Sequence, residues 1–116
     1  STVIEQISVK DLKRAQDSGA PRVIDVREKH EYDGGHVPGA EWIPMSLVPL
    51  RAEEFKSPDP VYVVCRTGSR SGQVVMWLAN QGIKTINVDG GTLMWQNQGF
   101  PVETGAAETA GRTTQP

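Results

Sequence analysis

Cys65 has the strongest case for chemistry in this sequence, because its neighbours are of the kinds that make a cysteine reactive. It is the only cysteine, and Arg66, Gly68 and Arg70 follow it closely. The thiolate is the nucleophilic form of cysteine, and positive charge together with free amide groups at the start of a helix favours that form. A glycine lets a loop turn its N–H groups inward to bind an anion. The spacing predicts a nucleophile inside an anion-binding loop.

The opposite interpretation is that Cys65 is an inert core residue, since a free cysteine at the end of an apolar strand is often simply buried. Residues 61–64 read as such a strand, and residues 71–81 read as a largely buried helix that ends at Gly82. A residue between the carboxyl end of a strand and the start of a helix occupies the place where parallel α/β sheets bind ligands. That placement, with the flanking arginines, favours the reactive interpretation.

The elements that must position this loop alternate along the chain, which indicates a parallel α/β sheet. Strands are expected at residues 23–26, 40–43, 61–64 and 85–88. Helices are expected at residues 9–18 (with Ser8 as the cap), 28–35 (a turn or short helix), 47–55, 71–81 and 92–98.

Asp25 and Arg27 close the first of these strands, near the sheet edge that Cys65 should share. A carboxylate inside an apolar strand must be hydrogen-bonded or paired. We therefore expect Asp25 to hold Arg27 or the active loop rather than to act as an acid or base. The acidic residues of 28–33 read as an exposed turn.

Four segments resemble motifs of one protein family, in the same order. The family's active-site loop is similar to residues 65–71 (Cys-Arg-Thr-Gly-Ser-Arg-Ser), and its Asp-x-Arg segment to residues 23–28. Its Gly-His-x-x-Gly-Ala turn is similar to residues 35–40, and its Gly-Gly-x-x-x-Trp ending to residues 89–95. Over roughly residues 7–103 the chain thus resembles the single-domain rhodaneses, which are sulfurtransferases. The resemblance implies a rhodanese-like three-layer α/β/α fold with a central parallel sheet of about five strands.

The resemblance also implies roles for residues. Cys65 would attack the outer sulfur of thiosulfate or a similar donor, carry the sulfur as a persulfide, and pass it to a thiol, to cyanide or to a protein acceptor. The implied substrate-binding loop is Arg66, Thr67, Gly68, Ser69 and Arg70, and the implied loop support is Asp25, Arg27 and Ser71. Arg70 either binds the donor anion or staples the loop through an ion pair. We expect no metal and no cofactor.

Phosphatases and arsenate reductases share this fold but have a loop one residue longer. In this chain Arg70 closes the loop, Ser71 stands where such an enzyme needs arginine, and Val64 stands where it has histidine. These differences argue against phosphatase chemistry. Other members of the family lack the cysteine and only bind partners, and the presence of Cys65 argues against that role.

A persulfide carrier or protein-interaction module with little small-molecule turnover stays open as an alternative. An apolar rim beside the loop would favour it, and the candidates are Trp42, Met45, Met94 and Trp95, which otherwise serve as core or pocket wall. His36 invites a Cys–His pair, but the resemblance places it in a turn, where we expect its ring to bond to the backbone.

Composition bounds the remaining possibilities. The chain has 116 residues, a net charge of −2 and 37% hydrophobic residues, and its apolar runs are far too short to span a membrane. The sequence contains no run of Lys and Arg residues of the kind that would favour nucleic-acid binding. We expect one domain over residues 1–103 and a flexible tail over 104–116, which lacks large apolar side chains. No signal peptide is visible, so a cytoplasmic location is expected.

Overall fold

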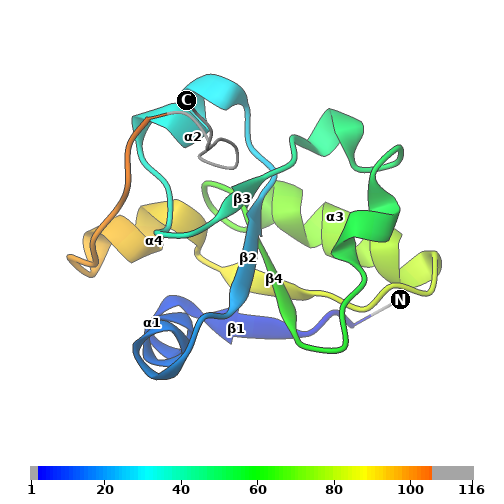
Figure 1. The fold of residues 1–116 in the computed structure, drawn as a ribbon, viewed down its shortest axis with the longest axis horizontal. Helices are drawn as coiled ribbons and strands as arrows, with labels where there is room; N and C mark the ends of the chain where they lie inside the picture. Colours follow the sequence, from blue (N-terminus) through cyan, green and yellow to red (C-terminus); the bar gives the residue numbers. More distant parts are fainter. Residues whose placement is uncertain (1–2, 106–116) are drawn as a thin grey trace, which may run out of the picture.

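Five parallel strands form one sheet at the centre of the molecule, in the order β1-β5-β4-β2-β3 (Figure 1). The computed structural model describes residues 3–105. The strands are β1 (Gln6–Ser8), β2 (Arg22–Asp25), β3 (Glu41–Trp42), β4 (Val61–Val64) and β5 (Ile86–Asp89). The helices are α1 (Val9–Ser18), α2 (Lys29–Gly34), α3 (Ser69–Asn80) and α4 (Gly91–Asn97), with two 3-10 turns, η1 (Met45–Leu47) and η2 (Ala52–Phe55).

The middle strand β4 is apolar on both faces because both faces are covered. Val61 and Val63 pack into a core with α3 and the two 3-10 turns, whereas Val64 packs into a second core with α1, α2 and α4. Alternation of side chains along a strand produces this division. The three-layer α/β/α arrangement with five parallel strands, which the family resemblance implied, is confirmed.

Several local expectations are confirmed and others differ. Ser8 caps α1, with its hydroxyl accepting from the N–H of Asp11 at 3.1 Å. The helix expected over 47–55 is instead divided between η1 and η2, since Pro49 has no N–H to continue a helical ladder. The strand expected over 40–43 is only two residues long. β1 was not expected from the sequence, because its three residues form no apolar run. This strand forms by pairing with β5.

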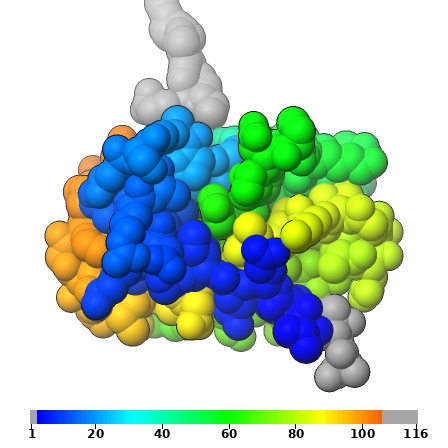
Figure 2. Space-filling view, turned by 90° about the horizontal axis from the view of Figure 1, so that it is seen from below, coloured from blue at the N-terminus to red at the C-terminus, as the bar shows by residue number. Residues whose placement is uncertain are grey.

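The N-terminal segment crosses the surface from α1 toward the far end of α3. Figure 2 shows it in dark blue, next to the yellow-green residues that end this helix. At the other end of the chain, the N–H of Gly105 donates to the carbonyl of Asp33 at 2.8 Å. Residues 106–116, which include most of the expected tail, lie outside the described residues. Within residues 3–105, no helix has the length and apolar character to cross a membrane.

Candidate active site

Cys65 lies at the carboxyl edge of the sheet, directly after β4. The register pairs Asp25 of β2 with Val64 of β4, and the N–H of Val26 donates to the Val64 carbonyl at 3.0 Å. The two strand ends therefore deliver Cys65 and the Asp25–Arg27 segment to one place, as parallel pairing requires. The sequence-based expectation that these residues share an edge is confirmed.

The first turn of α4 binds the loop through the backbone carbonyls of Cys65 and Arg66. The N–H of Thr92 donates to the Cys65 carbonyl at 2.9 Å, and the N–H of Leu93 donates to the Arg66 carbonyl at 2.9 Å. The Thr92 hydroxyl also donates to the Cys65 carbonyl at 3.2 Å. Gly91 permits this approach, since a Cβ added there would lie 2.4 Å from the Arg66 carbonyl oxygen. With its carbonyls turned outward, the loop can present its N–H groups to the sulfur.

Gly68 makes the turn that brings an amide to the sulfur. Its φ is +100°, which is in the left-handed region that favours glycine. Its N–H donates to Cys65 Sγ at 3.1 Å. A Cβ on Gly68 would also lie 3.3 Å from the Val88 carbonyl oxygen, so the loop packs closely on the end of β5.

Hydrogen-bond donors surround the sulfur of Cys65, a residue that is 1% exposed. Burial raises the pKa of the Cys65 thiol, and the Ser71 hydroxyl is the largest influence that lowers it. The backbone N–H groups of Ser71, Gly68 and Thr67 lower it further, and together these donors leave the pKa below its ordinary value. Because so little of the thiol is open, a donor must present a single protruding atom to it.

Ser71 is itself oriented by Asn87, a residue that the sequence analysis missed. The Ser71 hydroxyl lies 3.2 Å from Cys65 Sγ and 2.6 Å from Asn87 Oδ1, and its one proton can serve either acceptor. The Asn87 amide N–H groups donate to the Gly68 carbonyl at 3.2 Å and to Gln6 Oε1 at 3.0 Å. Since the Gly68 carbonyl can only accept, the amide nitrogen must face it and the amide oxygen must face Ser71.

Ser71→Ala is expected to raise the pKa of the Cys65 thiol, because the thiolate loses its strongest donor. Alkylation by iodoacetamide at neutral pH should slow by about fivefold, the effect of one hydrogen bond worth ~1 kcal/mol. The measurement is the pH profile of the alkylation rate. Ser69→Ala is the matched control, because Ser69 is exposed in the same loop. Equal profiles for wild type and Ser71→Ala would contradict this role.

Asp25 and Arg27 form a buried ion pair that leaves neither charged group free. The Asp25 carboxylate accepts from the Arg27 N–H at 3.0 Å and from the Arg27 guanidinium at 2.8–3.1 Å. Asp25 is 0% exposed and Arg27 5%. Arg27 also donates to the Gly35 carbonyl at 2.8 Å, so the pair connects β2 to the end of α2. This is the arrangement expected for a structural carboxylate.

Arg70 is paired with Glu31, a partner that no spacing in the sequence indicated. The two side chains meet in a bidentate pair with N–O distances of 2.8 and 2.9 Å. Hydrogen bonding from Arg70 lowers the pKa of Glu31 from 4.5 to about 2, so the stability that the pair adds is lost only as the pH falls through that range. Arg70 thus staples the loop to α2, and Glu31 is not part of a fully exposed acidic turn.

Arg66 is the loop's available cation. It is exposed, as are Thr67 and Ser69. Among the described residues, its guanidinium has no hydrogen bond or ion pair with another side chain. Of the two arginines that the sequence placed beside the cysteine, only Arg66 is therefore uncommitted.

His36 and the buried Trp95 have structural roles. His36 Nδ1 lies 2.7 Å from the Tyr32 carbonyl, so the expected ring-to-backbone contact is confirmed. Trp95 is fully buried, and its indole N–H donates to the Pro101 carbonyl at 2.7 Å. Met94 is 42% exposed on α4, the helix that holds the loop, and remains a candidate for an apolar rim.

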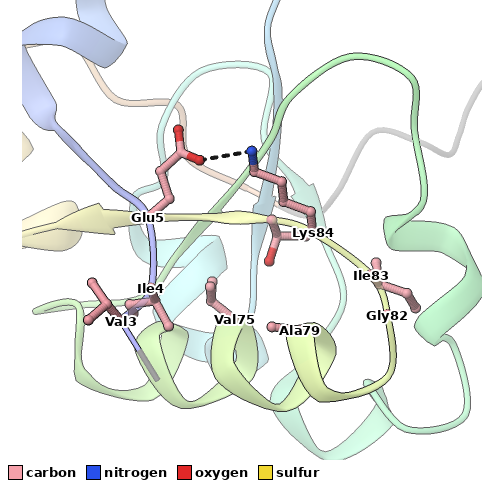
Figure 3. Close-up of a pocket in the computed structure, with 9 residues that line it drawn as sticks. Val3, Ile4, Glu5, Val75, Ala79, Gly82, Ile83 and Lys84 are labelled. Carbon is pink, nitrogen blue, oxygen red and sulfur yellow. Dashed lines mark ion pairs between the residues drawn. The ribbon is translucent and has the colours of Figure 1, made fainter. Parts of the chain in front are cut away.

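A separate pocket of about 430 Å³ lies near the end of α3 (Figure 3). Aliphatic side chains including Ile4, Val75 and Ala79 line it, and an ion pair between Glu5 and Lys84, 3.2 Å apart, stands at its side. None of its lining residues belongs to the loop over residues 65–71. It therefore adds nothing to the site around Cys65.

Comparisons with known proteins find relatives of this chain. The family model described as "Rhodanese-like domain" matches residues 8–98. A "Sulfurtransferase" from Allochromatium vinosum is 31% identical over 86% of this chain and 95% of that protein. The Bacillus subtilis "Putative sulfur carrier protein YrkF" is 37% identical over 79% of this chain, and the match spans only 51% of that longer protein. A rhodanese-like domain protein from Staphylococcus aureus has a TM-score of 0.79 at 33% identity, covering 89% of this chain and 100% of that one.

Proposed function

This chain belongs to the rhodanese-like domain family, and on that basis we propose that it moves a sulfane sulfur atom from a donor such as thiosulfate to a thiophilic acceptor. Relatives named sulfurtransferase or sulfur carrier support a role in sulfur transfer. The observation that carries the proposal is the pair of hydrogen-bond donors at Cys65 Sγ, the Gly68 N–H and the Ser71 hydroxyl.

The proposed reaction has two steps. The Cys65 thiolate attacks the outer sulfur of thiosulfate, the S–S bond of the donor breaks, and sulfite leaves with the electron pair. The outer sulfur remains on Cys65 as a persulfide anion. A thiolate or cyanide then attacks that sulfur and restores the Cys65 thiolate. The loop N–H groups stabilise the negative sulfur in both steps, as the donors of an oxyanion hole do.

The narrow access to Cys65 supports the transfer of an atom rather than of a phosphoryl group. Cys65 is only 1% exposed, so a donor that approaches it has to present a small terminal atom such as a sulfane sulfur. A phosphoryl group would need its phosphorus above the thiol and its oxygens within the ring of N–H groups. Steady-state assays with thiosulfate and either cyanide or a thiol test the proposal, with para-nitrophenyl phosphate and arsenate as comparison substrates. Efficient hydrolysis of the phosphate ester without sulfur transfer would refute it.

Arg66→Ala is expected to weaken the thiosulfate reaction, because it removes the uncommitted cation of the loop. The loss of one charge-assisted contact should lower kcat/KM for thiosulfate by roughly tenfold to a hundredfold. The effect falls on KM alone if Arg66 binds the ground state and transition state equally. Kinetics toward the acceptor should change less, since sulfite has left by then. Lys10→Ala, which removes an exposed charge on α1, is the control, and an unaltered thiosulfate reaction in Arg66→Ala would assign donor binding to the loop amides.

The alternative is a persulfide carrier that exchanges sulfur with a protein. The name of the Bacillus subtilis relative and the exposed Met94 favour it. A carrier would load sulfur on Cys65 and release it quickly to a protein thiol but slowly to cyanide, so acceptor kinetics separate the two functions. A reducing compartment such as the cytoplasm suits either function, because it keeps the unpaired Cys65 as a free thiol between cycles.

A further inference from the structure

We propose that Glu31 makes this site prefer sulfane donors that carry one negative charge over donors that carry two. The proposal rests on the proposed function and assigns a specificity-determining role to a residue that does not touch the sulfur. The favoured donor class is a monoanion with a terminal sulfur, such as an organic persulfide (R–S–S⁻) or a thiosulfonate (R–SO₂–S⁻). The disfavoured class is the dianion, of which thiosulfate is the example.

The charges around the loop carry the argument. Arg70 would add positive charge at the loop, but its guanidinium is held by both oxygens of Glu31 at 2.8 and 2.9 Å. Arg27 is held in the same way by Asp25. Two of the three nearby arginines are therefore neutralised by carboxylates. Arg66 is left to balance both the Cys65 thiolate and an incoming anion.

Glu31 cannot readily turn away to release Arg70. Its Oε1 accepts from the N–H of Glu28 at 3.0 Å, which is part of the capping box at the start of α2. The Glu31 side chain is 19% exposed, and that of Arg70 is 37% exposed. The carboxylate is thus a permanent negative charge beside the loop. Arg70 is also near enough to Cys65 and Asp25 for their charges to act on it.

The two donor classes differ by one charge in otherwise parallel steps. With thiosulfate, the Cys65 thiolate and the dianion bring three negative charges together; the products, a persulfide anion on Cys65 and sulfite dianion, carry the same three. With a thiosulfonate, the thiolate and the monoanion bring two charges, and the products are the persulfide anion and a sulfinate. In both steps the thiolate supplies the electron pair of the new S–S bond, and the old S–S pair leaves with the oxidised sulfur. The additional negative charge of thiosulfate is therefore present near the loop from the bound donor to the products.

Glu31→Gln separates the charge of Glu31 from its place in the fold. Glutamine has the same shape and keeps an oxygen that can accept from Arg70 and from Glu28, but it leaves the charge of Arg70 uncompensated. A single unit charge this close to a partly buried site should change the relative kcat/KM for a dianion and a monoanion by about tenfold. The probes are thiosulfate and methanethiosulfonate, which transfer the same kind of sulfur atom. The two donors differ in intrinsic reactivity. The quantity to measure is therefore the ratio of kcat/KM for thiosulfate to kcat/KM for methanethiosulfonate, compared between the wild type and Glu31→Gln.

Relative to methanethiosulfonate, thiosulfate should gain about tenfold in Glu31→Gln, mainly through a lower KM. Added salt should reduce the gain, as screening requires. Glu54→Gln is the matched control, because Glu54 of η2 makes a bidentate pair with Arg51, the residue just before η2, at 2.7 and 2.8 Å. That variant should leave the ratio unchanged. Glu31→Asp, which keeps the charge, should stay nearer to the wild-type ratio than Glu31→Gln does.

A purely structural Glu31 would give a different result. If the pair only staples the loop, Glu31→Gln will slow both donors alike and leave the ratio where it is, and that outcome overturns the proposal. A change of the kcat/KM ratio in favour of methanethiosulfonate would also overturn the proposal. A failure of the proposed sulfur-transfer function would look different. In that case the wild-type protein would take no sulfur onto Cys65 from either donor, and intact-mass measurement would show no gain.

Discussion

Cys65→Ser is expected to abolish sulfur loading and turnover together. In the proposed reaction the Cys65 sulfur forms the bond to the transferred atom, and a serine hydroxyl has neither the acidity nor the affinity for sulfur to replace it. Wild-type protein incubated with thiosulfate without reductant should gain the mass of one sulfur atom. Dithiothreitol or cyanide should remove that mass. Cys65→Ser should show no gain, and turnover should fall to background.

The control for this result is the fold of the variant. Serine is smaller and close in shape to cysteine, so the far-ultraviolet spectrum and the melting temperature should stay near those of the wild type. Ser69→Ala should retain sulfur loading, because it removes only an exposed hydroxyl and keeps every backbone N–H of the loop. Substantial sulfurtransferase activity in Cys65→Ser would eliminate the persulfide mechanism.

Asp25→Asn is expected to destabilise the protein strongly, since it leaves the buried Arg27 guanidinium without its counter-charge. Breaking a buried pair typically costs ~3–5 kcal/mol, against a total stability of ~5–15 kcal/mol. For a domain of this size that should lower the Tm by more than about 10 °C. The loss should also loosen the end of α2, where Arg27 donates to the Gly35 carbonyl.

Glu41→Gln provides the matched control for burial. Glu41 forms an equally bidentate pair with Arg22, at 2.7 and 3.0 Å, but both side chains are about one-third exposed. An exposed pair contributes ~0–1 kcal/mol, so this variant should melt close to the wild type. If Asp25→Asn melted like the wild type but lost all activity, Asp25 would instead have to act in the chemistry.

Much of the candidate site is encoded in short stretches of sequence. Cys65 comes directly after an apolar strand and a few residues before a helix, so its place at the carboxyl edge follows from local pattern. Asp25 and Arg27 are two positions apart, and a carboxylate within an apolar strand requires a near partner. The left-handed turn at Gly68 was also foreseeable, because glycine is the residue that adopts it without strain.

Residues brought from other elements could not be predicted in this way. Glu31 reads as one of several acidic residues in a turn, and Asn87 reads as an interruption in an apolar strand. β1 has no distinctive pattern, since its three residues are exposed or half-buried and its backbone bonds go to β5. The division of the segment 45–55 into two turns, by contrast, has a local signal in Pro49, which lacks the N–H that a continuous helix needs.

Local sequence patterns were enough to indicate Cys65 as the candidate nucleophile, the loop around it, the pairing of the buried Asp25 and the parallel α/β class. These follow from neighbours in the chain, whose geometry is constrained by covalent connection and by side-chain periodicity. The fold was needed to show which arginine is available, because Arg70 meets Glu31 across 39 positions of sequence. It was needed equally to show the partner of Ser71, which meets Asn87 across 16 positions. Side chains so far apart come together through strand order and helix packing, and any of several acidic residues could have paired with Arg70 until the fold brought Glu31 to it.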